Sequence, residues 1–204
     1  MSTADSERWD ESYRRDEPPP WDIGRPQPRF AALAALAGTG AFRGRLLDCG
    51  CGTGEHALMA AAEGADVVGV DLSSYAIEQA RRKADARGLT VRFDTGDALE
   101  LPAPDVPFDV VIDSGVFHSF DDTDRPRYVT SLRRQLRVGG TCYLMVFSDR
   151  QPGDWGPRRV RADELRAAFA GGWDVNVEPA VFEINPLDGI TEVQAWFATL
   201  RRVE

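Results

Sequence analysis

Lysine, histidine and cysteine are all scarce in this sequence. Its 204 residues include one lysine, Lys83, among 24 basic residues, together with two histidines and three cysteines. Cys49 and Cys51 lie too close along the chain to bridge easily, and an odd number leaves one cysteine over, so no disulfide framework is expected and a reducing cytoplasm is favoured. With no C-x-x-C pair and no histidine cluster at ligand spacing, no metal site is expected either.

Long apolar runs and an excess of positive charge are also missing. A membrane span needs roughly 18 apolar residues, and the nearest candidate, residues 30–42, is short and rich in alanine and glycine. Residues 1–16 are polar and charged, so they contain no signal-peptide core. The formal net charge of −9 would repel nucleic acid and anionic membranes. A small molecule is therefore the expected partner, and the oligomeric state is left open.

What the sequence does contain is a regular alternation of apolar strands and helical segments. Continuous apolar strands that alternate with helices predict an α/β fold, with a parallel sheet covered by helices on both faces. Two late strands without a helix between them predict an antiparallel hairpin at one edge. The expected strands cover residues 45–49, 66–71, 89–93, 108–113, 141–147, 173–184 and 191–200, and the expected helices cover 53–63, 73–87, 162–169 and a segment from 124 that Gly139 and Gly140 close.

Residues 1–29 differ from the rest of the chain. They are charged up to Asp16 and then rich in proline, so they cannot form one regular element. A disordered tail is one interpretation, but Trp9, Tyr13 and Trp21 are costly side chains to leave in water. We therefore expect an ordered arm or lid over residues 1–29, followed by one domain over residues 30–204.

A glycine-rich loop directly follows the first expected strand. Glycines at positions 50, 52 and 54 allow a tight turn and a close approach of the backbone to a ligand. A dinucleotide-binding loop needs its third glycine at position 55, where Glu55 would bring negative charge to the place of a pyrophosphate. A Tyr-x-x-x-Lys pair, which would favour an NAD-dependent oxidoreductase, is also missing, because Lys83 is the only lysine and no tyrosine precedes it at that spacing. The loop is therefore wrong for NAD.

Two aspartates lie at or near the ends of the next strands. Asp71 ends the strand over residues 66–71, and Asp97 follows the third strand. A carboxylate at the first position can accept hydrogen bonds from two ribose hydroxyls, and one at the second can accept from an adenine amino group. The alternatives are a helix cap for Asp71 and an ordinary turn for Asp97.

These segments together resemble the class I S-adenosylmethionine-dependent methyltransferases. The resemblance rests on Leu-Leu-Asp-Cys-Gly-Cys-Gly-Thr-Gly at 46–54, Val-Asp at 70–71, Gly-Asp-Ala at 96–98 and Phe-Asp-Val-Val at 108–111. It implies a Rossmann-like seven-stranded sheet with an antiparallel last strand. It also implies that the glycine loop passes beneath the methionine part of the cofactor, that Asp71 holds the ribose, and that Leu72, Asp97 and Ala98 contact the adenine. The expected cofactor-binding residues of this domain are Asp48, Gly50, Gly52, Gly54, Asp71, Leu72, Asp97, Ala98 and Ser114.

The N-terminal arm resembles a narrower group. Trp9-x-x-x-Tyr13 followed by Pro20-Trp21-Asp22-x-Gly24-x-Pro26 is similar to the thiopurine, thiol and halide methyltransferases and to related bacterial small-molecule methyltransferases. In that group an aromatic arm folds over the cofactor, which implies this role for Trp9, Tyr13 and Trp21. Tyr13 stands where many relatives carry a second tryptophan.

The acceptor should approach from the segment after the fourth strand, residues 113–120. His118 lies there, and an ordinary histidine pKa near 6.5 suits removal of a proton from a hydroxyl or thiol. A structural role is the alternative, because a thiolate, a halide or an acidic hydroxyl needs no base. For His56, which follows the glycine loop, we expect a role in packing or in capping the helix.

The sequence therefore predicts transfer of a methyl group from S-adenosylmethionine to a small nucleophile, with an aromatic or sulfur-containing acceptor favoured. A cofactor-binding module without turnover stays open, although an aromatic lid would then lack a purpose. A methyltransferase acting on a macromolecule is the other alternative. The acidic charge, the absence of an added recognition domain and the lack of an Asn/Asp-Pro-Pro-Tyr/Phe motif after the fourth strand argue against it.

Overall fold

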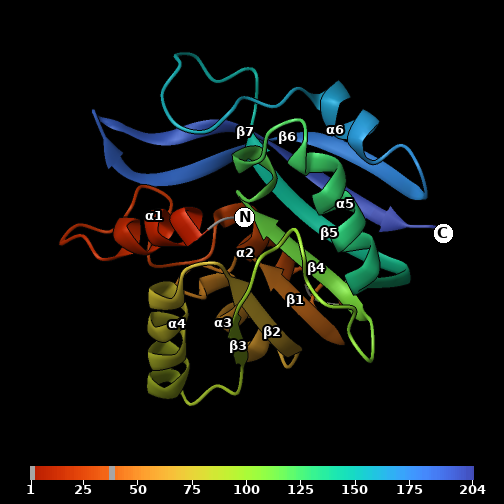
Figure 1. The fold of residues 1–204 in the computed structure, drawn as a ribbon, viewed down its shortest axis with the longest axis horizontal. Helices are drawn as coiled ribbons and strands as arrows, with labels where there is room; N and C mark the ends of the chain where they lie inside the picture. The colour runs from red at the N-terminus through yellow and green to blue at the C-terminus, as the bar shows by residue number, and fades with distance from the viewer. Residues whose placement is uncertain (1–2, 37–39) are drawn as a thin grey trace.

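The computed structural model describes residues 3–36 and 40–204. A seven-stranded sheet forms its centre, with the strand order β3-β2-β1-β4-β5-β7-β6 (Figure 1). The strands are β1 (Arg45–Cys49), β2 (Asp66–Asp71), β3 (Arg92–Thr95), β4 (Phe108–Ser114), β5 (Leu136–Phe147), β6 (Trp173–Leu187) and β7 (Ile190–Arg202). The helices are α1 (Thr3–Tyr13), α2 (Pro28–Ala35), α3 (Glu55–Ala62), α4 (Ser74–Arg87), α5 (Asp124–Gln135), α6 (Ala162–Ala168) and the one-turn helix η1 (Phe117–Ser119).

The pairing of the strands confirms the expected fold class. β1 is parallel to both β2 and β4, and β4 is parallel to β5, whereas β7 runs antiparallel to β5 and β6. The strand order reverses between β1 and β4, which is where open parallel sheets bind ligands, beyond the carboxyl ends of the strands. The glycine loop after β1 and the segment after β4 meet at this edge.

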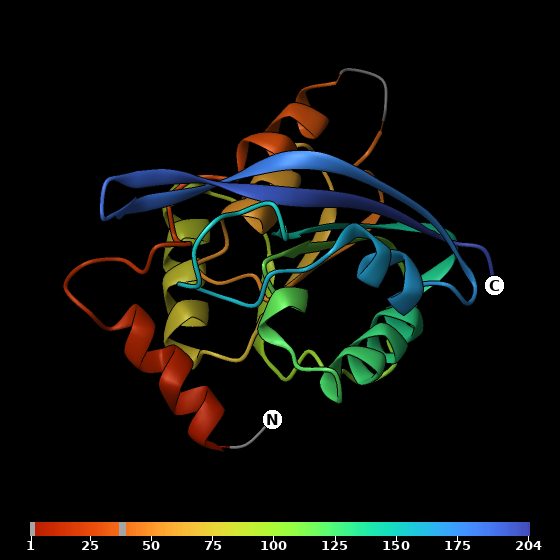
Figure 2. The same cartoon turned by 90° about the horizontal axis from the view of Figure 1, so that it is seen from above.

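Each face of the sheet has its own hydrophobic core. Side chains along a strand alternate between the faces, so Leu46 packs into one core and Leu47 into the other. The first core also contains buried residues of α2, α3 and α4, and the second contains buried residues of η1, α5 and α6. Figure 2 shows α2 and α3 on one side of the sheet and α5 and α6 on the other.

Several element boundaries differ from the expected ones, and two of the differences have a clear cause. The third strand was expected at residues 89–93 but begins at Arg92, because the Leu89 amide still closes the end of α4 by donating to the Ala84 carbonyl. The helix from residue 124 ends at Gln135 rather than at Gly139, because Leu136 already pairs with Phe108 as part of β5. The Arg202 guanidinium donates to the Arg133 carbonyl near this helix end.

The N-terminal segment contains a helix that the sequence did not reveal. α1 covers Thr3–Tyr13, and its charged composition gives it no apolar stripe, so no helical periodicity marks it. The expected boundary between residues 29 and 30 lies inside α2, and residues 1 and 2 of the expected arm lie outside the described residues.

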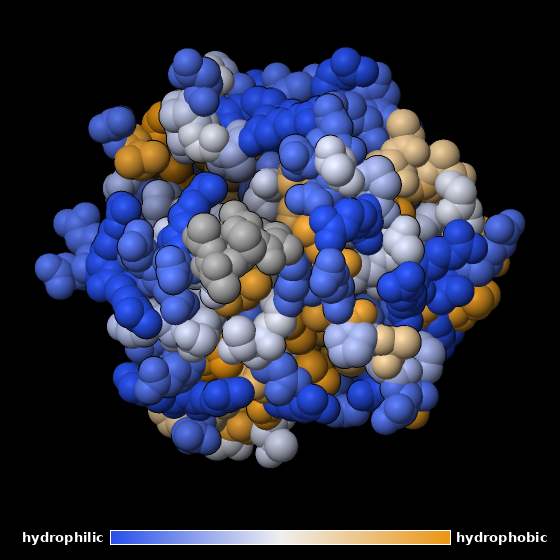
Figure 3. Space-filling model, viewed as in Figure 1, coloured by the Kyte–Doolittle hydropathy of each residue, from blue (hydrophilic) through white to orange (hydrophobic). Residues whose placement is uncertain are grey.

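Hydrophilic side chains cover most of the face shown in Figure 3, with smaller hydrophobic areas between them. None of the helices in the described ranges is long and apolar enough to cross a membrane. Over the same ranges, no group of three or more histidine, cysteine, aspartate or glutamate side chains is arranged to hold a metal ion.

Candidate active site

The glycine loop adopts a backbone that side chains would disturb. Gly50, Gly52 and Gly54 have φ angles of 72°, 52° and 89°, a region that favours glycine. A Cβ at Gly50 would lie 2.0 Å from Val116 Cγ2, and one at Gly52 would lie 2.8 Å from the Tyr13 hydroxyl. The loop is therefore shaped to pass close beneath the segment after β4 and the N-terminal arm.

Asp71 ties the end of β2 to this loop. Its carboxylate accepts hydrogen bonds from the backbone amides of Gly52 and Ser73, both at 2.8 Å. Burial raises the pKa of Asp71, and the two amides partly offset that rise. The sequence left open that Asp71 caps the following helix. That cap is Ser73 instead, whose hydroxyl accepts from the Ala76 amide. Each carboxylate oxygen of Asp71 retains a further lone pair for a ligand.

Asp48 lies behind the loop. Its side chain is buried and accepts a hydrogen bond from the Ala57 amide of α3 at 2.9 Å. Burial raises the pKa of Asp48 to about 7. Asp48 thus supports the start of α3 from below, and its expected contact with a cofactor stays a prediction.

Glu55 is the first residue of α3, and two cationic side chains neutralise its charge. Its carboxylate accepts from Lys83 Nζ at 2.8 Å and from two nitrogens of Arg87 at 3.0 Å. Burial alone would raise its pKa, but the hydrogen bonds from Arg87 and Lys83 outweigh burial and lower it. The single lysine of the chain is thus engaged at the glycine loop.

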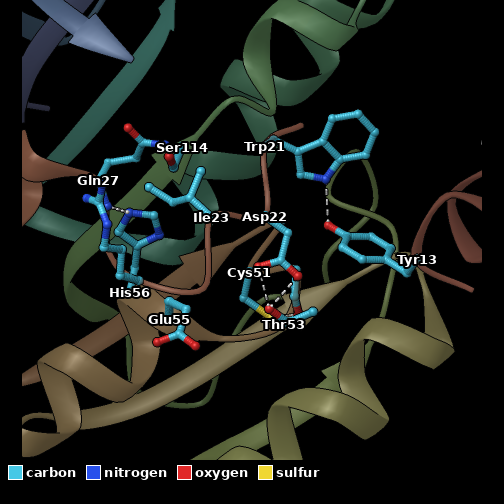
Figure 4. Close-up of a pocket in the computed structure, with 13 residues that line it drawn as sticks. Tyr13, Trp21, Asp22, Ile23, Gln27, Cys51, Thr53, Glu55, His56 and Ser114 are labelled. Carbon is cyan, nitrogen blue, oxygen red and sulfur yellow. Dashed lines mark hydrogen bonds between the residues drawn. The ribbon is translucent and has the colours of Figure 1, made fainter. Parts of the chain in front are cut away.

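Three aromatic side chains of the arm form one cluster. The Trp21 indole donates to the Tyr13 hydroxyl at 3.0 Å, and the Tyr13 ring meets the Trp21 ring edge to face at 6.2 Å (Figure 4). The Trp9 ring meets Trp21 in the same way at 5.5 Å. Since the Tyr13 hydroxyl lies over Gly52, the cluster covers the glycine loop.

α1 is held on the start of α4. The Asp10 carboxylate accepts from the Ser73 hydroxyl at 2.6 Å and from the Tyr75 amide at 3.1 Å. The Ser6 hydroxyl donates to the Leu72 carbonyl at 3.2 Å. The arm therefore contacts the same chain segment that carries Asp71.

The second part of the arm is bonded to β6. The Gln27 side chain exchanges two hydrogen bonds with the backbone of Glu183, both at 2.8 Å. The Asn185 amide and side chain donate to the carbonyls of Pro20 and Pro19 at 2.7 Å and 2.9 Å. Pro19, Pro20 and Gln27 are thus held by partners more than 150 positions away.

A pocket lies between the arm and the glycine loop (Figure 4). Five of the residues expected at the site line it: Tyr13, Trp21, Gly50, Gly52 and Ser114. Eight further residues line the pocket that were not among the predicted site residues: Asp22, Ile23, Arg25, Gln27, Cys51, Thr53, Glu55 and His56. Asp22 belongs to the arm motif, and Cys51 and Thr53 belong to the glycine-loop motif, so these two motifs were the signals that pointed to them.

The remaining expected residues lie outside this pocket. Asp97 accepts a hydrogen bond from the Leu99 amide at 2.9 Å, in the turn after β3. Leu72 directly follows β2, and Ala98 lies three residues after the end of β3, the strand that pairs with β2. Their expected place around an adenine is consistent with that edge of the sheet and stays a prediction.

Comparison with known proteins identifies the family. Residues 46–140 match the family model of a methyltransferase domain. The chain is 36% identical to 2-heptyl-1-hydroxyquinolin-4(1H)-one methyltransferase of Mycobacteroides abscessus over 182 residues, which cover 84% of this chain and 79% of the relative. The chain belongs to the S-adenosylmethionine-dependent methyltransferases.

Two further relatives match this methyltransferase over nearly its whole length. A probable thiol methyltransferase 2 of Arabidopsis thaliana is 26% identical over 96% of this chain and 87% of its own. A protein solved in work on the conversion of a disulfide bond into a thioacetal group during echinomycin biosynthesis has a TM-score of 0.85 and 38% identity, over 97% of this chain and 92% of that one. The similarity therefore includes the arm as well as the sheet.

The residues of the methyltransferase fit S-adenosylmethionine. A strand-end carboxylate with free lone pairs, Asp71, lies beside a loop in which Gly50, Gly52 and Gly54 leave the backbone open to a close approach. Aromatic rings above that loop favour a sulfonium by the attraction that they offer to other cations. When bound, the cofactor supplies an activated methyl group, and the protein has to align the nucleophile and exclude water.

His118 lies outside the pocket, where it packs against Phe147 of β5 and Phe182 of β6. Its Nδ1 accepts a hydrogen bond from the Phe147 amide at 3.0 Å, and its Nε2 lies 3.2 Å from where a Cβ on Gly115 would be. Burial, with smaller contributions from Arg125 and Arg159, lowers the pKa of His118 to about 3. The imidazole of the methyltransferase is therefore neutral, with its hydrogen on Nε2.

Proposed function

We propose that this methyltransferase acts on an oxygen or sulfur nucleophile of a small heterocyclic acceptor, and that this acceptor loses its proton without help from a protein base. The relatives support the acceptor class, since one is named for a hydroxyquinolone and another for thiols. A thiol ionises with a pKa of about 8.5, and an acidic hydroxyl on such a ring also loses its proton to water, which removes the need for general-base catalysis.

The bond from the Phe147 amide to His118 Nδ1 is the observation that carries this proposal. A neutral imidazole that accepts at Nδ1 carries its hydrogen at Nε2, so that nitrogen can donate a hydrogen bond but cannot take a proton. The geometry disfavours the general-base role predicted from the sequence. It favours His118 as a donor that orients an anionic acceptor.

The groups that line the pocket and could act as a base are also engaged. His56 Nε2 accepts from the Gln27 amide at 3.1 Å, and burial lowers the pKa of His56 to about 4. Asp22 accepts from the Thr53 hydroxyl, and Glu55 is paired with two cations. Among the described residues that line the pocket, each histidine and each carboxylate therefore already accepts a hydrogen bond.

The other expected site residues take their roles from this arrangement. Asp71 would accept from the ribose hydroxyls, Leu72, Asp97 and Ala98 would surround the adenine, and the glycine loop with Ser114 would hold the amino-acid end. The aromatic cluster of Trp9, Tyr13 and Trp21 would act as the lid. Hydrogen bonds that hold the arm on α4 and β6 support this role.

A pH–rate series over acceptors of different acidity tests the proposal. Since His118 does not titrate between pH 5 and 9, the rate should rise with pH through one inflection that moves with the pKa of each acceptor. An inflection at one fixed pH for every acceptor, absent in His118→Gln, would restore the general-base role and contradict the proposal.

We also infer a cytoplasmic protein without nucleic acid as a partner. The net charge of −9 supports this inference, as do the three buried free cysteines, which suit a reducing compartment. Fractionation of cells and a binding titration with duplex DNA at physiological salt test the two parts. Saturable binding of DNA at physiological salt would contradict the second.

A further inference from the structure

One side chain of the arm reaches the glycine loop directly. The Asp22 carboxylate accepts from the Thr53 hydroxyl, with both of its oxygens within 3.0 Å (Figure 4). Thr53 lies between Gly52 and Gly54 and is buried. This contact joins two segments 31 positions apart, one in the arm and one in the loop that the cofactor needs.

Lys83 fixes the direction of this hydrogen bond. Its ammonium group donates to Thr53 Oγ1 at 2.7 Å and has no lone pair to accept with. The single hydroxyl hydrogen of Thr53 is therefore left for Asp22. The result is an ordered chain of donors from Lys83 on α4, through Thr53, to Asp22 in the arm.

The other side of the same turn is held by β6. Asn185 donates to the Asp22 carbonyl at 2.7 Å, so Asp22 is bonded through its backbone to β6 and through its side chain to the glycine loop. Trp21 precedes Asp22, and its ring bonds Tyr13 above Gly52. The position of the aromatic cluster thus depends on where Asp22 is held.

We propose that Asp22 is a positioning residue that closes the arm over the cofactor through the Thr53 hydroxyl. The hydroxyl reaches Asp22 with residues 50–54 in the positive-φ conformation of the glycine loop, to which we assign binding of the amino-acid end of the cofactor. Closure of the aromatic cluster and formation of the cofactor loop are therefore one coupled event. The bonds to β6 alone keep the turn nearby without fixing it on the loop.

Binding of S-adenosylhomocysteine by isothermal calorimetry, with hydrogen exchange of residues 9–24, tests the coupling in the full-length protein. Thr53→Val keeps the shape of the side chain and removes the hydroxyl, and Thr53→Ser restores it. We expect Thr53→Val to weaken binding about tenfold, as for loss of a hydrogen bond to a charged group, and to speed exchange in the arm. Thr53→Ser should match the wild type in both readouts.

Asp22→Ala removes the acceptor of the same hydrogen bond and leaves the residues of the loop unchanged. If the two residues act through one contact, the double variant should bind about as weakly as either single variant, because the effects of coupled residues do not add. Thr130→Val is the matched control, since the Thr130 hydroxyl donates to the Pro126 carbonyl within α5. This variant should leave cofactor binding and exchange of the arm unchanged.

Three results would overturn the proposal. Wild-type affinity in Thr53→Val would show that the contact does not contribute to cofactor binding. Unchanged hydrogen exchange in the arm would show that it does not hold the arm closed. Multiplied losses in the double variant would mean that the two side chains act independently. Calorimetry reports binding without turnover, so the test stands whatever acceptor the enzyme uses.

Discussion

At the scale of single residues, the site is built on carboxylates held by backbone amides. Asp48 and Asp113 are buried and Asp71 is half-buried, each at or near a strand end, and loss of solvent raises the pKa of each. Asp113 accepts from the amides of Val116 and Phe117, which shapes the turn into η1. Of the three, Asp71 lies where a ligand can use its remaining lone pairs.

Replacing Asp71 should therefore affect ligand binding more than folding. Asp71→Asn keeps an acceptor for one amide but removes the charge, and we expect affinity for S-adenosylhomocysteine to fall about tenfold or more, as for loss of a charge-assisted hydrogen bond. Asp66→Asn is the control, because Asp66 lies at the opposite end of the same strand. Calorimetry showing equal affinity in both variants would exclude Asp71 from the site.

The sequence was informative about residues whose partners lie within one motif. The positive φ angles of the glycine loop and the place of Asp71 follow from local spacing. The contacts of Thr53, Gln27 and Asn185 do not, because each depends on a partner far along the chain. The tautomer of His118 is also a tertiary property, set by a single amide on β5.

At the scale of elements, the strands were predicted well because their apolar runs are continuous. β1 and β2 have the expected bounds, and the two late strands form the expected hairpin, although each is longer. α1 was missed because its polar sequence is ordered by what it docks on. Its Asp10 carboxylate satisfies a free amide and two hydroxyls at the start of α4.

Removing that carboxylate should release α1 from α4. Asp10→Ala should speed hydrogen exchange across α1 and weaken binding of S-adenosylhomocysteine, with a cost of about 0.5–2 kcal/mol as for a lost helix cap. Glu11→Ala, an exposed neighbour with the same change of charge, is the control. Equal exchange rates in the two variants would show that Asp10 does not hold the arm.

At the scale of the whole molecule, one edge of the sheet collects the functional groups. The loops after β1, β2 and β4 reach it from the sheet, and the arm reaches it from the N-terminus (Figure 1). Alternation of elements predicted the layers, and the resemblance predicted the strand count. Neither revealed how the arm is bonded to β6, which closes the site from outside.

The most direct test of this account is the formation of S-adenosylhomocysteine from S-adenosylmethionine, measured over a panel of hydroxyquinolones, thiols, phenols and amines with Asp71→Asn beside the wild type. We expect turnover on an acidic hydroxyl or thiol, one methylated product for each S-adenosylhomocysteine formed, and about tenfold less turnover in the variant when S-adenosylmethionine is kept below its dissociation constant. Turnover confined to weakly acidic amines, or equal turnover in both proteins, would contradict it.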